Sequence, residues 1–380
     1  MITSNNAAAS ERFLYIDFLR GLAAMLVIYQ HTIEVAAKVP PELILNLAES
    51  AIANFFTKQI GIGEIGVCIF LMVSGFVVPF SLSTYHVAPV KTFVIHRFFR
   101  LYPAYWLSAI LGLVFVYWRF GVSQGGKELD WTVFAINLTM FQAFFDVENI
   151  IGSYWTLSLE LFFYLSCIYL FSFSKLNSLK SILLIMLLVM LLPRLVHRMA
   201  DVSAYTANVL AYLRYTGYMF FGLLYREWLL DKNSTKAAKA LLVLLLTYFQ
   251  FVEREILTLD AIYLKTPVTQ LIAIVIFVLM TSVLRVNVKL GNFLGKISYS
   301  MYLFHPVIFY PLYTYFWLIL SPEWQAHPHL FFVLASLLTI PFSYCSYRWL
   351  EQPSIAFGKK FTLRRQQTRM PPTTNMKAQT

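Results

Sequence analysis

Residues 13–32 read FLYIDFLRGLAAMLVIYQHT, a mostly apolar stretch with the length that a helix needs to cross a bilayer. The stretch nevertheless holds Asp17, Arg20 and His31. Ionisable side chains are costly inside a membrane, so they mark functional sites by default. On a helix, Arg20 and His31 lie about 16 Å apart along the axis and within roughly 20° of each other around it. We expect one helix to present a cation and an imidazole on one stripe. The alternative is a snorkelling arginine and a histidine in contact with water.

The composition is typical of a membrane protein with many spans. The chain has 380 residues, of which 59% are hydrophobic and only 13% are charged. Soluble proteins carry about twice that charged fraction. The net charge of +11 does not indicate nucleic acid, because the basic residues are scattered between apolar segments, as the positive-inside rule predicts. The three cysteines are widely spaced and no P-loop or HExxH motif occurs, so we expect no metal site.

Ten apolar segments have spanning length: 13–36, 60–84, 101–118, 155–173, 181–196, 206–229, 238–252, 266–284, 298–320 and 329–350. With the N-terminus inside, most lysines and arginines fall on the inner side, which is the orientation that the positive-inside rule favours.

The segment 131–145 is shorter and rich in Asn, Thr and Gln. If it spanned the membrane, the basic C-terminal tail would lie outside, against the rule, so we expect a re-entrant or interfacial segment. The sequence therefore predicts an all-α membrane protein with about ten transmembrane helices and both termini cytoplasmic. We expect a tail over 1–12, one transmembrane domain over 13–353, and a basic, disordered tail over 354–380.

Several basic residues gather at the inner end of the third segment. Arg97 and Arg100 stand at i and i+3 on one helical face, with Lys91 nearby. Two arginines on one face form a fork that suits phosphate groups, although topology alone also explains basic residues here.

The ninth segment begins LGKISYSMYLFHP and contains Ser298, Tyr299 and His305. Ser298 and His305 are about two turns apart and share a face. A capped helix start with a satisfied histidine is the alternative interpretation.

The second segment contains Ser74 and Gly75 within IFLMVSGF. Either these small residues allow close helix packing, or the helix breaks and exposes backbone groups around Ser74.

The fourth segment places Trp155 and Glu160 at its outer start. Glu160 lies deep enough to need a partner, such as Arg214 or His31. At the end of the tenth segment, the simplest interpretation pairs Glu351 with Arg348 at i−3.

Taken together, these motifs resemble the acyltransferase family 3 of integral-membrane O-acyltransferases, which modify bacterial surface glycans among other acceptors. The resemblance covers about 13–353 and rests on DFLRGLAAMLVIYQH, GVCIFLMVSGF, RFFRLYPAYW, YWTLSLE, LGKISYSMYLFHP and YRWLEQP. Relatives often carry an acidic or polar residue where this chain has Cys68.

The resemblance implies an acyl-CoA donor on the cytoplasmic side, with acetyl-CoA expected, and an acceptor hydroxyl that is commonly periplasmic. It implies a location in the bacterial inner membrane. The expected partners are acyl-CoA, a glycan or lipid-linked oligosaccharide, membrane lipids and, as an open alternative, a second copy of the chain; nucleic acid is not expected. The acceptor could instead be a small molecule or a lipid headgroup.

The expected roles of the side chains form three groups. The catalytic group is His31, as general base or acyl carrier, with Arg20 and Glu160. The donor-binding group is Arg97, Arg100, Lys91, Ser298 and His305. Acceptor-side or supporting residues are Ser74, Gly75, Trp155, Arg214, Tyr299, Glu351 and Asp17. A transporter or flippase of an anionic lipid or glycan is the alternative from another class; it predicts inverted repeats, and none is visible.

Overall fold

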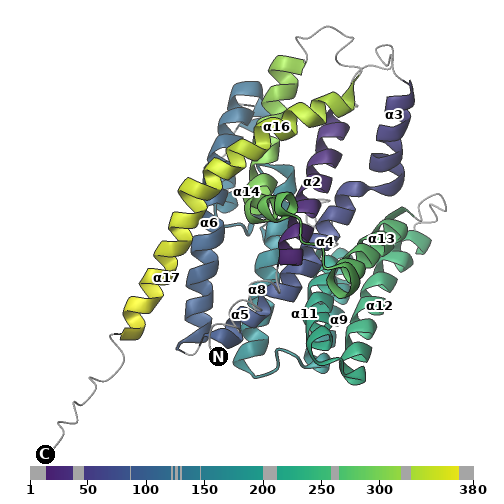
Figure 1. Cartoon of the computed structure of the whole chain (residues 1–380), viewed down its shortest axis with the longest axis vertical. Coiled ribbons are helices and arrows are strands. Elements are labelled where there is room, and N and C mark those ends of the chain that lie inside the picture. Colours follow the sequence, from purple (N-terminus) through teal and green to yellow (C-terminus); the bar gives the residue numbers. More distant parts are fainter. Residues whose placement is uncertain are drawn as a thin grey trace, which may run out of the picture.

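The computed structural model describes residues 14–36, 47–85, 87–120, 123–124, 127–128, 131–145, 147–199, 212–257, 265–317 and 327–367. These residues form a bundle of helices (Figure 1). The extended pieces among them are two short strands, β1 (Ser123–Gln124) and β2 (Lys127–Glu128), which pair antiparallel.

The helices in chain order are α2 (Leu14–Ala36), α3 (Leu47–Asn54), η2 (Phe55–Ile60), α4 (Ile62–Val77), α5 (Pro79–Thr84), α6 (Pro89–Phe120), α7 (Trp131–Asn137), η3 (Gln142–Phe144), η4 (Gly152–Tyr154), α8 (Trp155–Ser172), α9 (Leu179–Met199), η5 (Leu213–Tyr215), α11 (Thr216–Asp231), α12 (Ser234–Leu257), α13 (Lys265–Leu279), η6 (Met280–Leu284), α14 (Lys289–Pro311), η7 (Leu312–Trp317), α16 (Pro328–Ser346), η8 (Tyr347–Glu351) and α17 (Gln352–Gln367). Each of the ten predicted apolar segments therefore contains a helix.

Within the described ranges, six helices are long and apolar enough to cross a membrane: Ile62–Thr84, Pro89–Phe115, Gly152–Ser172, Ser234–Val252, Thr266–Leu284 and Pro328–Thr362. A shorter apolar helix covers Leu179–Leu192. The chain is thus an all-helical membrane protein with several apolar helices, and the number of ten spans and the orientation of the termini stay predictions.

Helices α2 and α14 cross in direct backbone contact. A Cβ atom added to Gly295 would lie 1.8 Å from the carbonyl oxygen of Asp17, and one added to Gly21 would lie 2.7 Å from the carbonyl oxygen of Gly291. Only glycine permits this approach, because any side chain would separate the two backbones. The crossing fixes the position of Arg20 relative to the polar face of α14.

A second close crossing joins α4 to α11 through Gly75 and Gly222. A Cβ on Gly75 would lie 1.8 Å from the carbonyl oxygen of Met219, so Gly75 serves helix packing. Helix α4 runs unbroken through Ser74 and ends at Val77. The helix therefore does not break around Ser74, and packing is the interpretation that holds for this pair.

The segment 131–145 is not a spanning helix. Helix α7 has seven residues, about 10 Å, and irregular backbone follows it. Hydroxyl and indole groups of Tyr102, Tyr105 and Trp106 on α6 donate to the carbonyl oxygens of residues 139, 137 and 138 at 2.9, 2.6 and 2.9 Å. Irregular backbone is tolerated at membrane depth where neighbouring protein satisfies its polar groups, so α6 stabilises this segment.

The C-terminal helix extends further than the sequence predicts. Helix α17 continues to Gln367, through the first part of the tail that was expected to be disordered. It packs on α6, where the rings of Phe99 and Phe357 lie 5.2 Å apart and His96 hydrogen-bonds to Thr362 at 3.0 Å. The predicted tail 1–12 and residues 368–380 lie outside the described residues.

Candidate functional site

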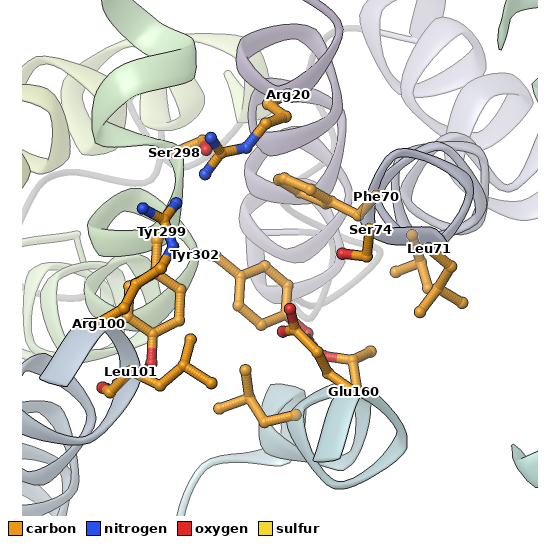
Figure 2. A pocket seen from close by; sticks show the side chains of 13 residues that line it. Arg20, Phe70, Leu71, Ser74, Arg100, Leu101, Glu160, Ser298, Tyr299 and Tyr302 are labelled. Atoms are coloured by element: carbon orange, nitrogen blue, oxygen red, sulfur yellow. Dashed lines mark hydrogen bonds between the residues drawn. The ribbon is translucent and has the colours of Figure 1, made fainter. Parts of the chain in front are cut away.

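A cavity opens between α2, α4, α6, α8 and α14, and it measures about 640 Å³ including its open mouth (Figure 2). Polar and charged groups share its wall with apolar side chains. Its lining residues are Arg20, Val67, Phe70, Leu71, Ser74, Arg100, Leu101, Thr156, Leu157, Glu160, Ser298, Tyr299 and Tyr302.

Three charged side chains line this cavity from three helices. Figure 2 shows Arg20, Arg100 and Glu160 turned toward the same central space. Nη1 of Arg20 lies 3.6 Å from Oδ1 of Asp17, one turn earlier on α2. The lining therefore presents two guanidinium groups that can bind an anionic ligand, beside the Glu160 carboxylate.

Glu351 lies close enough to the two cavity arginines to interact with their charges. Its side chain is buried, accepts a hydrogen bond from the Ser300 hydroxyl, and interacts favourably with the charges of Arg20 and Arg100. The predicted pair with Arg348 is wrong, because Arg348 donates to Gln352 at 3.1 Å. The π-helical turn η8 explains the difference, since its wider turns remove the i−3 spacing from a common face.

Glu160 lines the cavity together with Arg20 and Arg100, and its carboxylate interacts with the charge of Arg20. It does not pair with the partners predicted from the sequence. The hydroxyl of Tyr164 donates to its carboxylate. Arg214 instead places its guanidinium over the ring of Phe251 at 5.1 Å. The predicted pairing of Glu160 with Arg214 or His31 is therefore wrong.

Trp155 lies outside the cavity, although it begins the same helix as Glu160. Its ring stacks on Tyr212 with centroids 4.3 Å apart. Five residues separate Trp155 from Glu160, which turns their side chains to different faces of α8.

The three basic residues of the predicted phosphate site, Lys91, Arg97 and Arg100, lie in three different environments. Arg100 lines the cavity, whereas Lys91 is exposed at the start of α6. Arg97 is half-buried; its guanidinium lies over the rings of Phe93 and Tyr164, at 5.2 and 5.3 Å, and donates to the Ser81 hydroxyl at 3.2 Å.

A pair of histidines lies beyond the cavity along α2 and α14. Nδ1 of His31 is 2.9 Å from Nε2 of His305, and the two ring planes differ by 17°. His305 is fully buried, whereas His31 is partly exposed. Of Ser298 and His305, which were both predicted to bind the donor, only Ser298 lines the cavity. His305 lies against His31.

Tyr302 contacts both the cavity and the histidine pair. Its ring lines the cavity and lies 5.9 Å from the ring of His305. Its hydroxyl hydrogen-bonds to the Ser153 carbonyl at 2.6 Å and to the Thr156 hydroxyl at 2.5 Å.

The neighbouring Tyr299 donates to the carbonyl oxygen of Leu101 at 2.8 Å. Tyr302, Thr156, Tyr164 and Ser300 were not predicted from the sequence. Helical spacing from Ser298 through Tyr302 to His305 is the signal that could have found Tyr302.

A family model described as an acyltransferase domain matches residues 13–348. No curated protein and no solved structure matches the chain. The family match covers nearly the whole bundle and every residue described above as lining the cavity. The protein therefore belongs to acyltransferase family 3, a family of integral-membrane acyltransferases.

Proposed function

We propose that the protein is an O-acyltransferase that moves an acyl group from cytoplasmic acyl-CoA to a hydroxyl of a cell-surface polysaccharide or lipid-linked glycan. Acetyl-CoA is the expected donor, and the bacterial inner membrane is the expected location. The observation that carries the proposal is one helix, α2, with Arg20 in an arginine-lined cavity and His31 in a histidine pair further along.

The cavity suits the donor because acyl-CoA is anionic and has a narrow pantetheine arm. Guanidinium groups bind phosphate with paired, charge-assisted hydrogen bonds, and Arg100 presents such a group to the cavity. Arg97 lies over the ring of Tyr164, whose hydroxyl donates to the cavity residue Glu160, so Arg97 is close to this site without lining it.

His31 suits the role of general base toward the acceptor. It lies about 16 Å beyond Arg20 along the helix, a distance that an extended pantetheine arm spans. In the proposed step, His31 takes the acceptor's hydroxyl proton as the oxygen attacks the thioester carbonyl. A C–O bond forms, the C–S bond breaks, and the CoA thiolate takes the proton back from the imidazolium.

The test measures release of CoA from radiolabelled acetyl-CoA by the purified full chain in nanodiscs. Separate reactions contain a polysaccharide, a lipid-linked oligosaccharide or a small-molecule acceptor. Because general-base help is worth about 10²–10⁴-fold, His31→Ala should lose CoA release by that factor. Lys236→Ala removes a surface cation that pairs with Asp231 and serves as the control.

Three results would change the proposal. Equal turnover by His31→Ala and the unaltered chain would remove His31 from the reaction. Release of CoA with a small acceptor alone would replace the glycan with a small molecule. An acyl group trapped on His31 in the absence of acceptor would make His31 an acyl carrier.

A further inference from the structure

The hydrogen bonds of His305 fix which of its ring nitrogens carries the proton. Nδ1 of His305 lies 3.1 Å from the carbonyl oxygen of Met301. A carbonyl oxygen only accepts hydrogen bonds, so Nδ1 must carry the hydrogen. Full burial favours the uncharged ring, because an imidazolium would lose its hydration there. Nε2 of His305 is then a bare acceptor.

The same reasoning extends one ring further, to His31. Nδ1 of His31 lies 2.9 Å from the bare Nε2 of His305, so the His31 nitrogen must donate. The angle of 17° between the ring planes allows the N–H to point along the partner's lone pair. In the uncharged His31 ring, the other nitrogen, Nε2, is therefore free of a proton.

We propose that His305 is a positioning residue that fixes the tautomer and the orientation of His31, so that His31 presents an unprotonated Nε2 to the acceptor hydroxyl. The inference rests on the proposed function and assigns to His305 a role other than donor binding. Exposure separates the two roles, because His305 is fully buried and only His31 is accessible to a substrate.

The proton balance of the proposed step follows from this arrangement. Nε2 of His31 takes the acceptor's proton while its Nδ1–H stays hydrogen-bonded to His305. The Nδ1–H of His305 stays on the Met301 carbonyl, so no proton passes along the pair. The hydrogen bond to His305 becomes charge-assisted once His31 is an imidazolium, which stabilises the state that forms during attack.

Two substitutions of His305 separate positioning from packing. In His305→Gln, the side-chain Oε1 can accept the Nδ1–H of His31 near the place of the original Nε2; in His305→Leu, nothing can. We expect His305→Gln to keep kcat within about tenfold and His305→Leu to lose about 10²–10⁴-fold, with the KM for acetyl-CoA unchanged in both. The control is His329→Leu, which removes a histidine that bonds Tyr29 on another face of α2 and should leave kcat unchanged.

The outcomes divide as follows. A normal kcat in His305→Leu would overturn the inference, and a raised KM with unchanged kcat would return His305 to donor binding. Equal losses of kcat and of thermal stability in both variants would reduce His305 to packing, which also overturns it.

A spectroscopic readout tests the inference without any turnover. In the full chain labelled with ¹⁵N-histidine, the signals that vanish in His31→Ala belong to His31. We expect them to show a protonated Nδ1 and a bare Nε2, and to show a mixture of tautomers in His305→Leu. A protonated Nε2 on His31 would overturn the inference, even if the chain released no CoA and the proposed function had failed.

Discussion

Gly295 is a position where a single methyl group should disturb the site, although this residue is not among those that line the cavity. In Gly295→Ala the new Cβ would lie 1.8 Å from the carbonyl oxygen of Asp17, against ordinary contacts of 3.4 Å and more. Helices α2 and α14 must therefore separate by about 1.6 Å, or rotate to the same effect. Overpacking of this kind costs about 1–3 kcal/mol of stability.

The same displacement moves Arg20 and His31, which lie on α2, relative to Ser298 and His305, which lie on α14. A misplacement of about 1 Å can cost 10²-fold in rate, so we expect kcat to fall by about that factor. The assay combines thermal unfolding of the purified chain with release of CoA from acetyl-CoA.

A matched substitution controls for the added methyl group. Gly152→Ala introduces the same atom at a position where nothing lies within 4 Å, and it should leave both the unfolding temperature and kcat unchanged. If Gly295→Ala unfolded at the same temperature as the unaltered chain and turned over at the same rate, the α2–α14 crossing would not hold the site, and the reasoning would be refuted.

Two further predictions concern other contacts. Burial alone would raise the pKa of the Glu49 carboxyl, but hydrogen bonds from His327 and His329, at 2.9 and 3.0 Å, outweigh it and hold that pKa below its ordinary 4.5. The carboxylate's contribution to stability is then complete above pH 4.5 and is lost as the pH falls through the lower, folded pKa. Thermal unfolding measured from pH 7 to pH 3 should therefore show a smaller acid-induced loss of stability in Glu49→Gln than in the unaltered chain. An identical loss of stability would contradict the contact. Tyr164→Phe removes the hydroxyl that holds Glu160 but keeps the ring, so kcat should fall about tenfold in the unaltered chain and no further in Glu160→Gln. Additive losses in this double-mutant cycle would show that Tyr164 does not act through Glu160.

The sequence predicts the helices well because apolar segments of spanning length have few alternatives to a helix in a membrane. It also brings Arg20 forward, since arginine inside an apolar segment is costly and therefore conspicuous. Arg100 comes forward through its i, i+3 spacing from Arg97. Both side chains line the cavity.

The tertiary contacts of these residues lie beyond sequence reasoning. His31 and His305 are 274 residues apart, and their contact depends on the crossing of α2 and α14. That crossing follows from glycines whose partners cannot be read from spacing alone.

Local departures from the regular helix account for a further difference. Arithmetic with 3.6 residues per turn places Glu351 beside Arg348, whereas the π-helical turn η8 directs Glu351 inward to Ser300. The wider turn has no sequence signature that spacing arguments detect.

The most direct test of the central claim is the affinity of the cavity for the donor. We propose to measure equilibrium binding of a non-reactive thioether analogue of acetyl-CoA to the full chain in nanodiscs, with the unaltered protein and with Arg100→Leu. Hydrogen bonds to charged groups contribute about 1.5–3 kcal/mol, so the account predicts binding about 10- to 150-fold weaker in Arg100→Leu. Equal affinity for the two proteins would contradict the assignment of the arginine-lined cavity as the donor site.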